Sequence, residues 1–294
     1  MTAVSTAESG GSAARQLRQR FLSAAKGLYR RPASAVGTTI FLIFLLTAIF
    51  GPMIAPYGFS QQIAADVRQA PSLRHPFGTD NLGRDVFSRV VVGARDILTL
   101  AGLGTALAVL SGTGFGLISG YLGGMFDETI MRFFDSLLAM PALLLSLLLL
   151  GTLGPSRNSV LIVIVTVYTP IVARVVRSVV LSVKTKGFVE AARVQGAPLH
   201  RLLFQEILPS TLPALAVEAA LRFSYAIFLV ASLGFLGVGV QPPSPDWGLM
   251  VKEARTFVRQ IPWALYFPAG AIAVVVIGVN LMADGLKRVL QQDE

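Results

Sequence analysis

Long stretches without a charged residue are the feature that most constrains this sequence of 294 residues. One covers residues 33–55 and another covers 97–126. A helix of about 20 apolar residues crosses the roughly 30 Å hydrocarbon core of a bilayer. The sequence therefore predicts an all-α integral membrane protein, in which Pro141 should kink the third span. We expect six transmembrane helices, at about residues 36–56, 97–120, 128–151, 158–180, 211–236 and 263–284.

The overall composition supports a membrane location. Hydrophobic residues make up 53% of the chain and charged residues only 14%, with a mean hydropathy of +0.66. A soluble protein has nearly twice that share of charged residues. The net charge of +9 fits cationic loops beside a membrane, so we expect no nucleic-acid partner. The chain has no cysteine, which excludes a disulfide framework and a thiol nucleophile.

The distribution of arginine and lysine predicts the orientation. Basic residues concentrate before the first predicted helix, between the fourth and the fifth, and after the sixth. Cytoplasmic loops carry such an excess, and an even number of spans puts these three regions on one side. Both termini are therefore expected in the cytoplasm, with residues 1–32 as a tail and 33–294 as the transmembrane domain. Residues 15–31 could form a basic amphipathic helix on the membrane lipid or a solvated positive flank.

Glycines recur every fourth residue along the second predicted helix and its end. Such a ladder lines one helix face and lets another backbone come close. We favour this packing role over local flexibility. The glycines are Gly112, Gly116, Gly120 and Gly124.

Two pairs of opposite charges lie within the predicted spans. Arg132 and Asp135 are three residues apart, while Glu218 and Arg222 are four apart, so each pair can meet on one helix face. A lone charge at the bilayer centre costs about 2.5–3.5 kcal/mol. For both pairs we favour structural neutralisation over a role in a substrate pathway.

Groups that could support catalysis are scarce. His75 and His200 fall in loops on opposite sides, so no catalytic arrangement uses both. No metal-ligand cluster is evident. No lysine follows a glycine, which excludes a phosphate-binding P-loop. We therefore expect a non-catalytic membrane protein without bound cofactor or metal. If ATP drives transport here, the ATPase must be another chain.

The predicted cytoplasmic loop 184–209 has the most informative pattern. Residues 188–195 are good helix formers, and Gly196 can adopt the positive φ that ends a helix. A second amphipathic helix is expected over 199–208, with Pro209 breaking it. Such a unit could insert into a groove on a partner, or it could be an ordinary amphipathic connector.

This loop resembles the EAA motif of ABC-importer permeases. The motif residues that match in spacing are Glu190, Ala191, Ala192, Gly196, Leu208 and Pro209. Glu206 occupies the position where the family usually has isoleucine. The resemblance implies that the loop forms the coupling helix that docks into an ATPase subunit.

Three further stretches resemble dipeptide/oligopeptide/nickel importers, in particular their second, "C"-type permease. They cover residues 75–95, 120–141 and 234–248, and residues 280–286 extend the likeness. The resemblance implies the type I importer fold in a bacterial plasma membrane. It also implies a second homologous permease, two ATPase subunits that bind ATP and Mg, and an extracytoplasmic substrate-binding protein. Dipeptides, oligopeptides, nickel chelates and haem-like cargo are all carried within this family.

The predicted outer loops contain four residues that we assign to docking of the binding protein or to an outer gate. The alternative for these loops is a solvated surface with an interfacial tryptophan. Two rivals to the whole interpretation are a stand-alone secondary carrier and an intramembrane enzyme. The four residues are Arg84, Asp85, Arg95 and Trp247.

Overall fold

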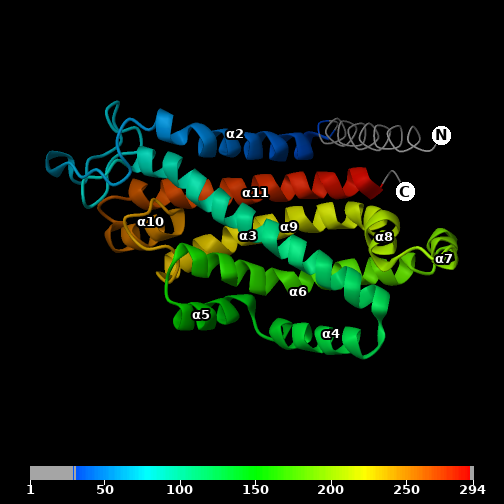
Figure 1. Ribbon diagram of the computed structural model, residues 1–294. Helices are drawn as coiled ribbons and strands as arrows, with labels where there is room; N and C mark the ends of the chain where they lie inside the picture. The colour runs from blue at the N-terminus through cyan, green and yellow to red at the C-terminus, as the bar shows by residue number, and fades with distance from the viewer. Residues whose placement is uncertain (1–28, 30, 292–294) are drawn as a thin grey trace, which may run out of the picture.

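The computed structural model describes residue 29 and residues 31–291, and this part of the chain is helical and contains no strand. The predicted tail 1–32, including the possible helix 15–31, lies almost wholly outside the described residues. Five helices are long and apolar enough to cross a bilayer, and they run along the length of the molecule (Figure 1). They are α2 (Pro32–Ile54), α3 (Val86–Leu122), α6 (Arg157–Val183), α9 (Leu208–Leu236) and α11 (Trp263–Gln291).

The third predicted span, 128–151, is two helices that together are apolar enough for one broken span, so Pro141 does more than kink it. The chain forms α4 (Gly124–Leu138) and α5 (Ala142–Leu153), which meet at a bend of 92°. Pro141 lies in the break, with an extended backbone, as the residue that precedes α5. Proline has no N–H to donate and disfavours helical geometry in the residue before it, so it separates the two helices completely.

The shorter elements gather at the two ends of the molecule. One end carries the loop 55–85 and α10, and the other carries α7 and α8 (Figure 1). The first turn of α2 and the last turn of α11 lie at the α7 end, as the charge distribution predicts. The short elements are η1 (Ala64–Asp66), α7 (Gly187–Val194), α8 (Leu199–Arg201), η2 (Leu202–Ile207), α10 (Trp247–Ala254) and η3 (Arg255–Phe257).

The glycine ladder brings α3 against α6. A Cβ atom added to Gly116 would lie 2.6 Å from the carbonyl oxygen of Ala173 and 2.7 Å from the Cβ of Val176. Contacts of 2.6 Å at Gly112 and 2.9 Å at Gly120 face the ladder one turn away in each direction, so three of its four members lie in the α3–α6 contact. The facing valines of α6 are Val172, Val176 and Val180.

Gly124 does not belong to this contact. Nothing lies within 4 Å of a Cβ built on it, and its φ is +61°. It begins α4 next to Gly123, whose φ is +67°. Because L-residues with side chains rarely adopt such values, Gly124 serves the sharp turn after α3 and the packing prediction for it was wrong.

The ion pairs differ in part from those predicted. Glu218 and Arg222 pair at 2.7 Å, as expected. Arg132 instead pairs with Glu128 one turn earlier, and Asp135 pairs with Arg174 of α6, each at 2.5 Å. The predicted Arg132–Asp135 pair is therefore wrong, because each of these residues has another partner of opposite charge.

Replacing Gly116 by valine should loosen the α3–α6 contact. The added atoms overlap the α6 backbone, and overpacking of this kind costs about 1–3 kcal/mol. We expect a lower midpoint of thermal unfolding for G116V in detergent. G114V is the matched control, since nothing lies within 4 Å of a Cβ at Gly114 on the same helix. Equal midpoints for the two variants would contradict the packing role.

Candidate functional site

The loop between α6 and α9 projects from one end of the molecule (Figure 1). Its helix α7 covers Gly187–Val194, close to the predicted 188–195. The helix ends in a Schellman motif, because the N–H of Ala197 donates to the carbonyl of Ala192 and the N–H of Gly196 donates to that of Arg193. Gly196 has a φ of +79°, the positive value expected for the residue that ends this helix. Its surroundings are open, so its backbone conformation is what requires glycine here.

One face of α7 rests on a hydrophobic cluster. Val189 is buried in this cluster. Ala192 of the motif and the neighbouring Ala197 pack against it. The cluster joins α3 and α6 to α7 and η2, so α7 rests on these two long helices. Its buried members are Leu117, Val172, Val176, Val180, Val183, Val189, Leu202, Leu203 and Ile207.

The other face of the loop is exposed. Glu190, Ala191 and Gly196 of the predicted coupling motif point away from the cluster, as does Pro209. Large apolar side chains are exposed beside them, and exposed apolar groups that cluster mark interaction surfaces. These side chains are Phe188, Val194, Leu199 and Phe204.

The chain continues from this loop into α9 without a break. Residues 202–207 form a stretch of π-helix, in which the N–H of Leu208 donates to the carbonyl of Leu203. Pro209 follows in the first turn of α9, where it has no N–H to donate to the preceding turn. The prediction that Pro209 breaks the helix was therefore wrong, because the wider turn before it accommodates the proline.

Polar contacts hold the base of the loop to α3 and α4. The Nζ of Lys184 donates to the carbonyl of Gly120 at 2.8 Å, in the last turn of α3. The guanidinium of Arg177 donates two hydrogen bonds of 2.6 Å to the carboxylate of Asp127 on α4. A bidentate pair of this kind fixes the relative orientation of the two helices. These contacts attach the base of the loop to α3 and α4.

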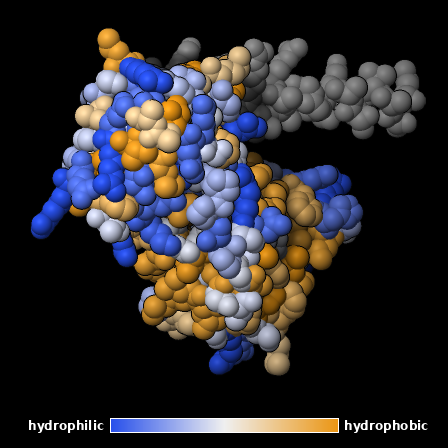
Figure 2. Space-filling view, turned by 90° about the vertical axis from the view of Figure 1, so that its left-hand side faces the viewer, coloured by the Kyte–Doolittle hydropathy of each residue, from blue (hydrophilic) through white to orange (hydrophobic). Residues whose placement is uncertain are grey.

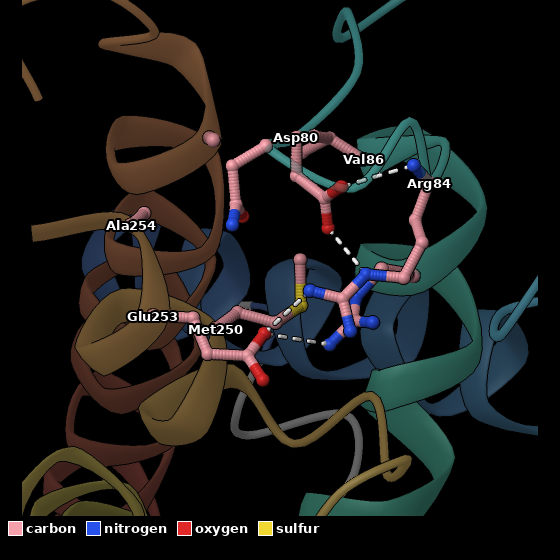
Figure 3. A pocket seen from close by; sticks show the side chains of 9 residues that line it. Asp80, Arg84, Val86, Met250, Glu253 and Ala254 are labelled. Carbon is pink, nitrogen blue, oxygen red and sulfur yellow. Dashed lines mark hydrogen bonds and ion pairs between the residues drawn. The ribbon is translucent and has the colours of Figure 1, made fainter. Parts of the chain in front are cut away.

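A network of charged side chains occupies the opposite end of the molecule (Figure 3). Arg84 donates to Asp80 in its own loop at 2.5 Å and to Glu253 of α10 at 2.7 Å. Arg89 of α3 lies 3.4 Å from the same oxygen of Glu253. The network joins the loop 55–85, α10 and α3. Sequence reasoning selected Arg84 but missed Asp80, Arg89 and Glu253, although Asp80 and Arg84 share one motif four residues apart.

Trp247 is fully buried under this surface. Its indole Nε1 donates to the carbonyl of Val90 at 2.9 Å, and its ring fills the space that Gly93 leaves open on α3. Phe44 of α2 packs edge-on against the ring. Neither an interfacial tryptophan nor a direct contact for a partner fits this position. Trp247 attaches α10 to α3 and α2.

The remaining predicted docking residues also differ in exposure. Asp85 is buried, caps α3 by accepting from the N–H of Ser88 at 2.7 Å, and lies 2.8 Å from the Nδ1 of His75. His75 is fully buried too and lies between Asp85 and Asp66. Arg84 is buried, and only Arg95 is exposed. Any partner that docks here therefore meets the loop surface that these buried groups organise. In the upper part of Figure 2 this surface is largely hydrophilic, with some apolar patches between.

Asp246, which precedes α10 at the same end of the molecule, is a buried carboxylate with a raised pKa. Its carboxylate caps α10 by accepting from the N–H of Leu249 at 2.8 Å, and its other oxygen has no hydrogen-bond partner among the described residues. Burial raises the pKa of Asp246 to about 7, and the neighbouring Asp96 adds to the shift. The N–H groups of Leu249 and Gly248 oppose that rise in pKa.

Comparison with known families gives two matches. Residues 112–293 match the family described as "Binding-protein-dependent transport system inner membrane component". Residues 20–71 match the "N-terminal TM domain of oligopeptide transport permease C". The first match includes the projecting loop, the α4–α5 bend and α10.

Curated bacterial proteins are similar over most of their length. A dipeptide transport system permease protein of Alkalihalophilus pseudofirmus is 41% identical over 265 residues, which cover 90% of this chain and 87% of that protein. A glutathione transport system permease protein of Escherichia coli is 40% identical over 264 residues, covering 89% and 87%. An oligopeptide transport system permease protein of Bacillus subtilis is 38% identical over 255 residues, covering 87% and 84%.

The titration of Asp246 predicts a pH dependence of stability. Because its pKa in the folded protein lies above the ordinary 3.8, the folded state binds this proton more tightly than the unfolded state. The destabilisation by the buried charge is absent below about pH 4 and complete above about pH 7. We expect the thermal midpoint of wild type to rise, relative to that of D246N, as the pH falls through this window. Asparagine keeps the helix cap, so parallel curves for the two proteins would contradict the assignment.

Proposed function

Because this chain belongs to the family of binding-protein-dependent transport system inner membrane components, we propose that it is one of two homologous permease subunits of an ATP-driven importer of short peptides. It is a multi-pass protein of the bacterial inner membrane. In the proposed complex, two ATPase subunits bind ATP and Mg, and an extracytoplasmic binding protein delivers the substrate. This chain lines half of the pathway.

The names of the relatives favour peptides as cargo. The three relatives described above are permeases for dipeptides, glutathione and oligopeptides. All three substrates are short chains of amino acids with at least one free carboxylate. This shared chemistry favours short peptides over the nickel chelates and haem-like molecules that the wider family also carries.

The geometry of α7 is the observation that carries the coupling role. A surface that receives force from a partner must be accessible on one side and firmly supported on the other. The motif residues Glu190, Ala191 and Gly196 are exposed, while Val189 and Ala192 face the hydrophobic cluster below. An ordinary connector needs no such support, so the arrangement favours a docking helix for an ATPase subunit.

Force on α7 would be distributed to several transmembrane helices. Lys184 and Arg177 attach the base of the loop to α3 and α4, and η2 continues into α9. When ATP draws the two ATPase subunits together, α7 would move with them and tilt these helices as one unit. Opening and closing of the two ends of the pathway then alternate, as in other rigid-body transitions.

A stand-alone secondary carrier remains the rival function. Such a carrier would be driven by an ion gradient and would need no exposed helix seated for docking. The exposed apolar side chains on and beside α7, including Phe188 and Val194, favour a chain that works within a complex. Uptake by this chain alone in liposomes, without ATPase, would favour the carrier.

Replacing Gly196 by valine should uncouple ATP hydrolysis from uptake. A β-branched residue resists the φ of +79°, so the Schellman motif would open and α7 would lose its fixed position. We expect G196V to insert and assemble, and to show at least a tenfold loss of peptide uptake per ATP hydrolysed. The measurement is uptake and hydrolysis by the reconstituted complex.

G196N is the matched control for this variant. Asparagine tolerates positive φ, and open space surrounds the position, so G196N should keep most of the coupling. Normal coupling in G196V would contradict the proposed role of the loop. Equal loss in both variants would show that the side chain, rather than the backbone conformation, is what matters.

A further inference from the structure

A cavity of about 680 Å³ opens beside the break between α4 and α5. Its walls come from the break itself, from α6 and from α9. Most lining side chains are apolar, and a single charged side chain, Arg222, lines it. The polar and aromatic lining residues are Tyr168, Arg222, Tyr225, Phe228 and Ser232.

Arg222 lies at the midpoint of α9, which spans Leu208–Leu236. This helix belongs to a stretch long and apolar enough to cross a membrane, and Arg222 lies well inside that stretch rather than at either end. Charged residues inside a membrane span are expensive and usually serve a substrate or ion pathway. Arg222 lines a cavity instead of a contact between helices. This position is the first reason to infer that Arg222 binds a ligand.

The ion pair with Glu218 leaves part of Arg222 available. The Nε of Arg222 lies 2.7 Å from a carboxylate oxygen of Glu218, yet the two groups are not aligned as a hydrogen bond. Among the described residues, no hydrogen bond uses the two Nη groups of Arg222. Glu218 therefore lowers the cost of the charge and leaves the donors of the planar fork for another acceptor.

Two tyrosines hold the guanidinium in place. The ring centroids of Tyr168 and Tyr225 lie 5.7 Å and 4.8 Å from the guanidinium carbon, within the range of cation–π contacts. Tyr168 is buried in α6, and Tyr225 is half exposed on α9. The first turn of α5 lines the same cavity through Ala142 and Leu143, and its N-terminus has no side-chain cap. Its free N–H groups add positive potential to the same cavity.

We propose that Arg222, held by Tyr168 and Tyr225, binds a carboxylate group of the peptide during its passage. The proposal rests on the proposed function, since it names a contact for the cargo of that pathway. A partly neutralised arginine binds an anion less tightly than a free one. Such a site favours transit, because a transport site must release what it binds. The apolar walls, including Phe228, suit peptide side chains of varied shape.

The test compares uptake of trialanine and trialanine amide by the complete complex in vesicles. The amide lacks the C-terminal carboxylate but is otherwise nearly identical. Wild type and R222Q use the same binding protein, so its own preference cancels in the ratio of the two rates. R132Q is the matched control, because Arg132 also pairs with a glutamate four residues earlier but lies on the exposed face of α4.

We expect R222Q to lower the ratio of acid to amide uptake about tenfold or more, the effect of losing a charge-assisted hydrogen bond. R222K should lower the ratio of acid to amide uptake less than R222Q does. R132Q should leave this ratio at the wild-type value. An unchanged ratio in R222Q, or an equal loss for both substrates, would overturn the proposal. An equal loss is the result expected if Arg222 meets a lipid headgroup or an acidic side chain of the second permease.

A second measurement covers the case in which R222Q fails to assemble. The chain has no cysteine, so S232C introduces a unique thiol on the cavity wall. Trialanine should slow labelling of S232C in the transporting complex more than trialanine amide does, and equal protection would overturn the proposal. If wild type takes up neither substrate, peptide import itself fails and this site fails with it. If wild type takes up both and R222Q keeps their ratio, only the site fails.

Discussion

The close approach of α3 and α6 is the contact on which the rest of the molecule depends. Glycines of α3 allow it, and without them the backbones could not meet at Gly112, Gly116 and Gly120. The same helix carries Gly93, which receives Trp247 at one end, and Gly120, whose carbonyl accepts from Lys184 at the other. Helix α3 thus joins the network around α10 to the projecting loop. Small residues let helix backbones approach closely, and the van der Waals packing that follows helps to drive helix association in a membrane.

This construction fits the alternating access proposed above, in which the chain must move as a rigid unit. Different interactions stabilise the two ends of the molecule. A charged network around Arg84 and Glu253 holds one end together, and a hydrophobic cluster beneath α7 holds the other. Between the two ends, the chain bends at the α4–α5 break, and a cavity opens beside this bend. The cavity at that break contains Arg222. A body that tilts as a unit while one side lines a cavity is what alternating access requires.

The sequence predicted those features that depend on local periodicity. Five spans, the helix α7 and its end at Gly196 follow from apolar length and from backbone preference. The features that it missed depend on tertiary context. Pro141 separates two helices instead of kinking one, and Pro209 is accommodated by a π-helical turn. Trp247 looked interfacial because its partner, Gly93, lies far away in the chain. No spacing rule could have paired Asp135 with Arg174.

The most direct test of the central claim is cross-linking from both ends of the assembled complex. Val194 and Leu73 are among the most exposed large side chains, at 89% and 105% of the reference area, and the chain has no cysteine. V194C should form a cross-link to an ATPase subunit through a short thiol-reactive linker, and L73C should not. A cross-link of the ATPase to L73C, or to neither position, would contradict the account.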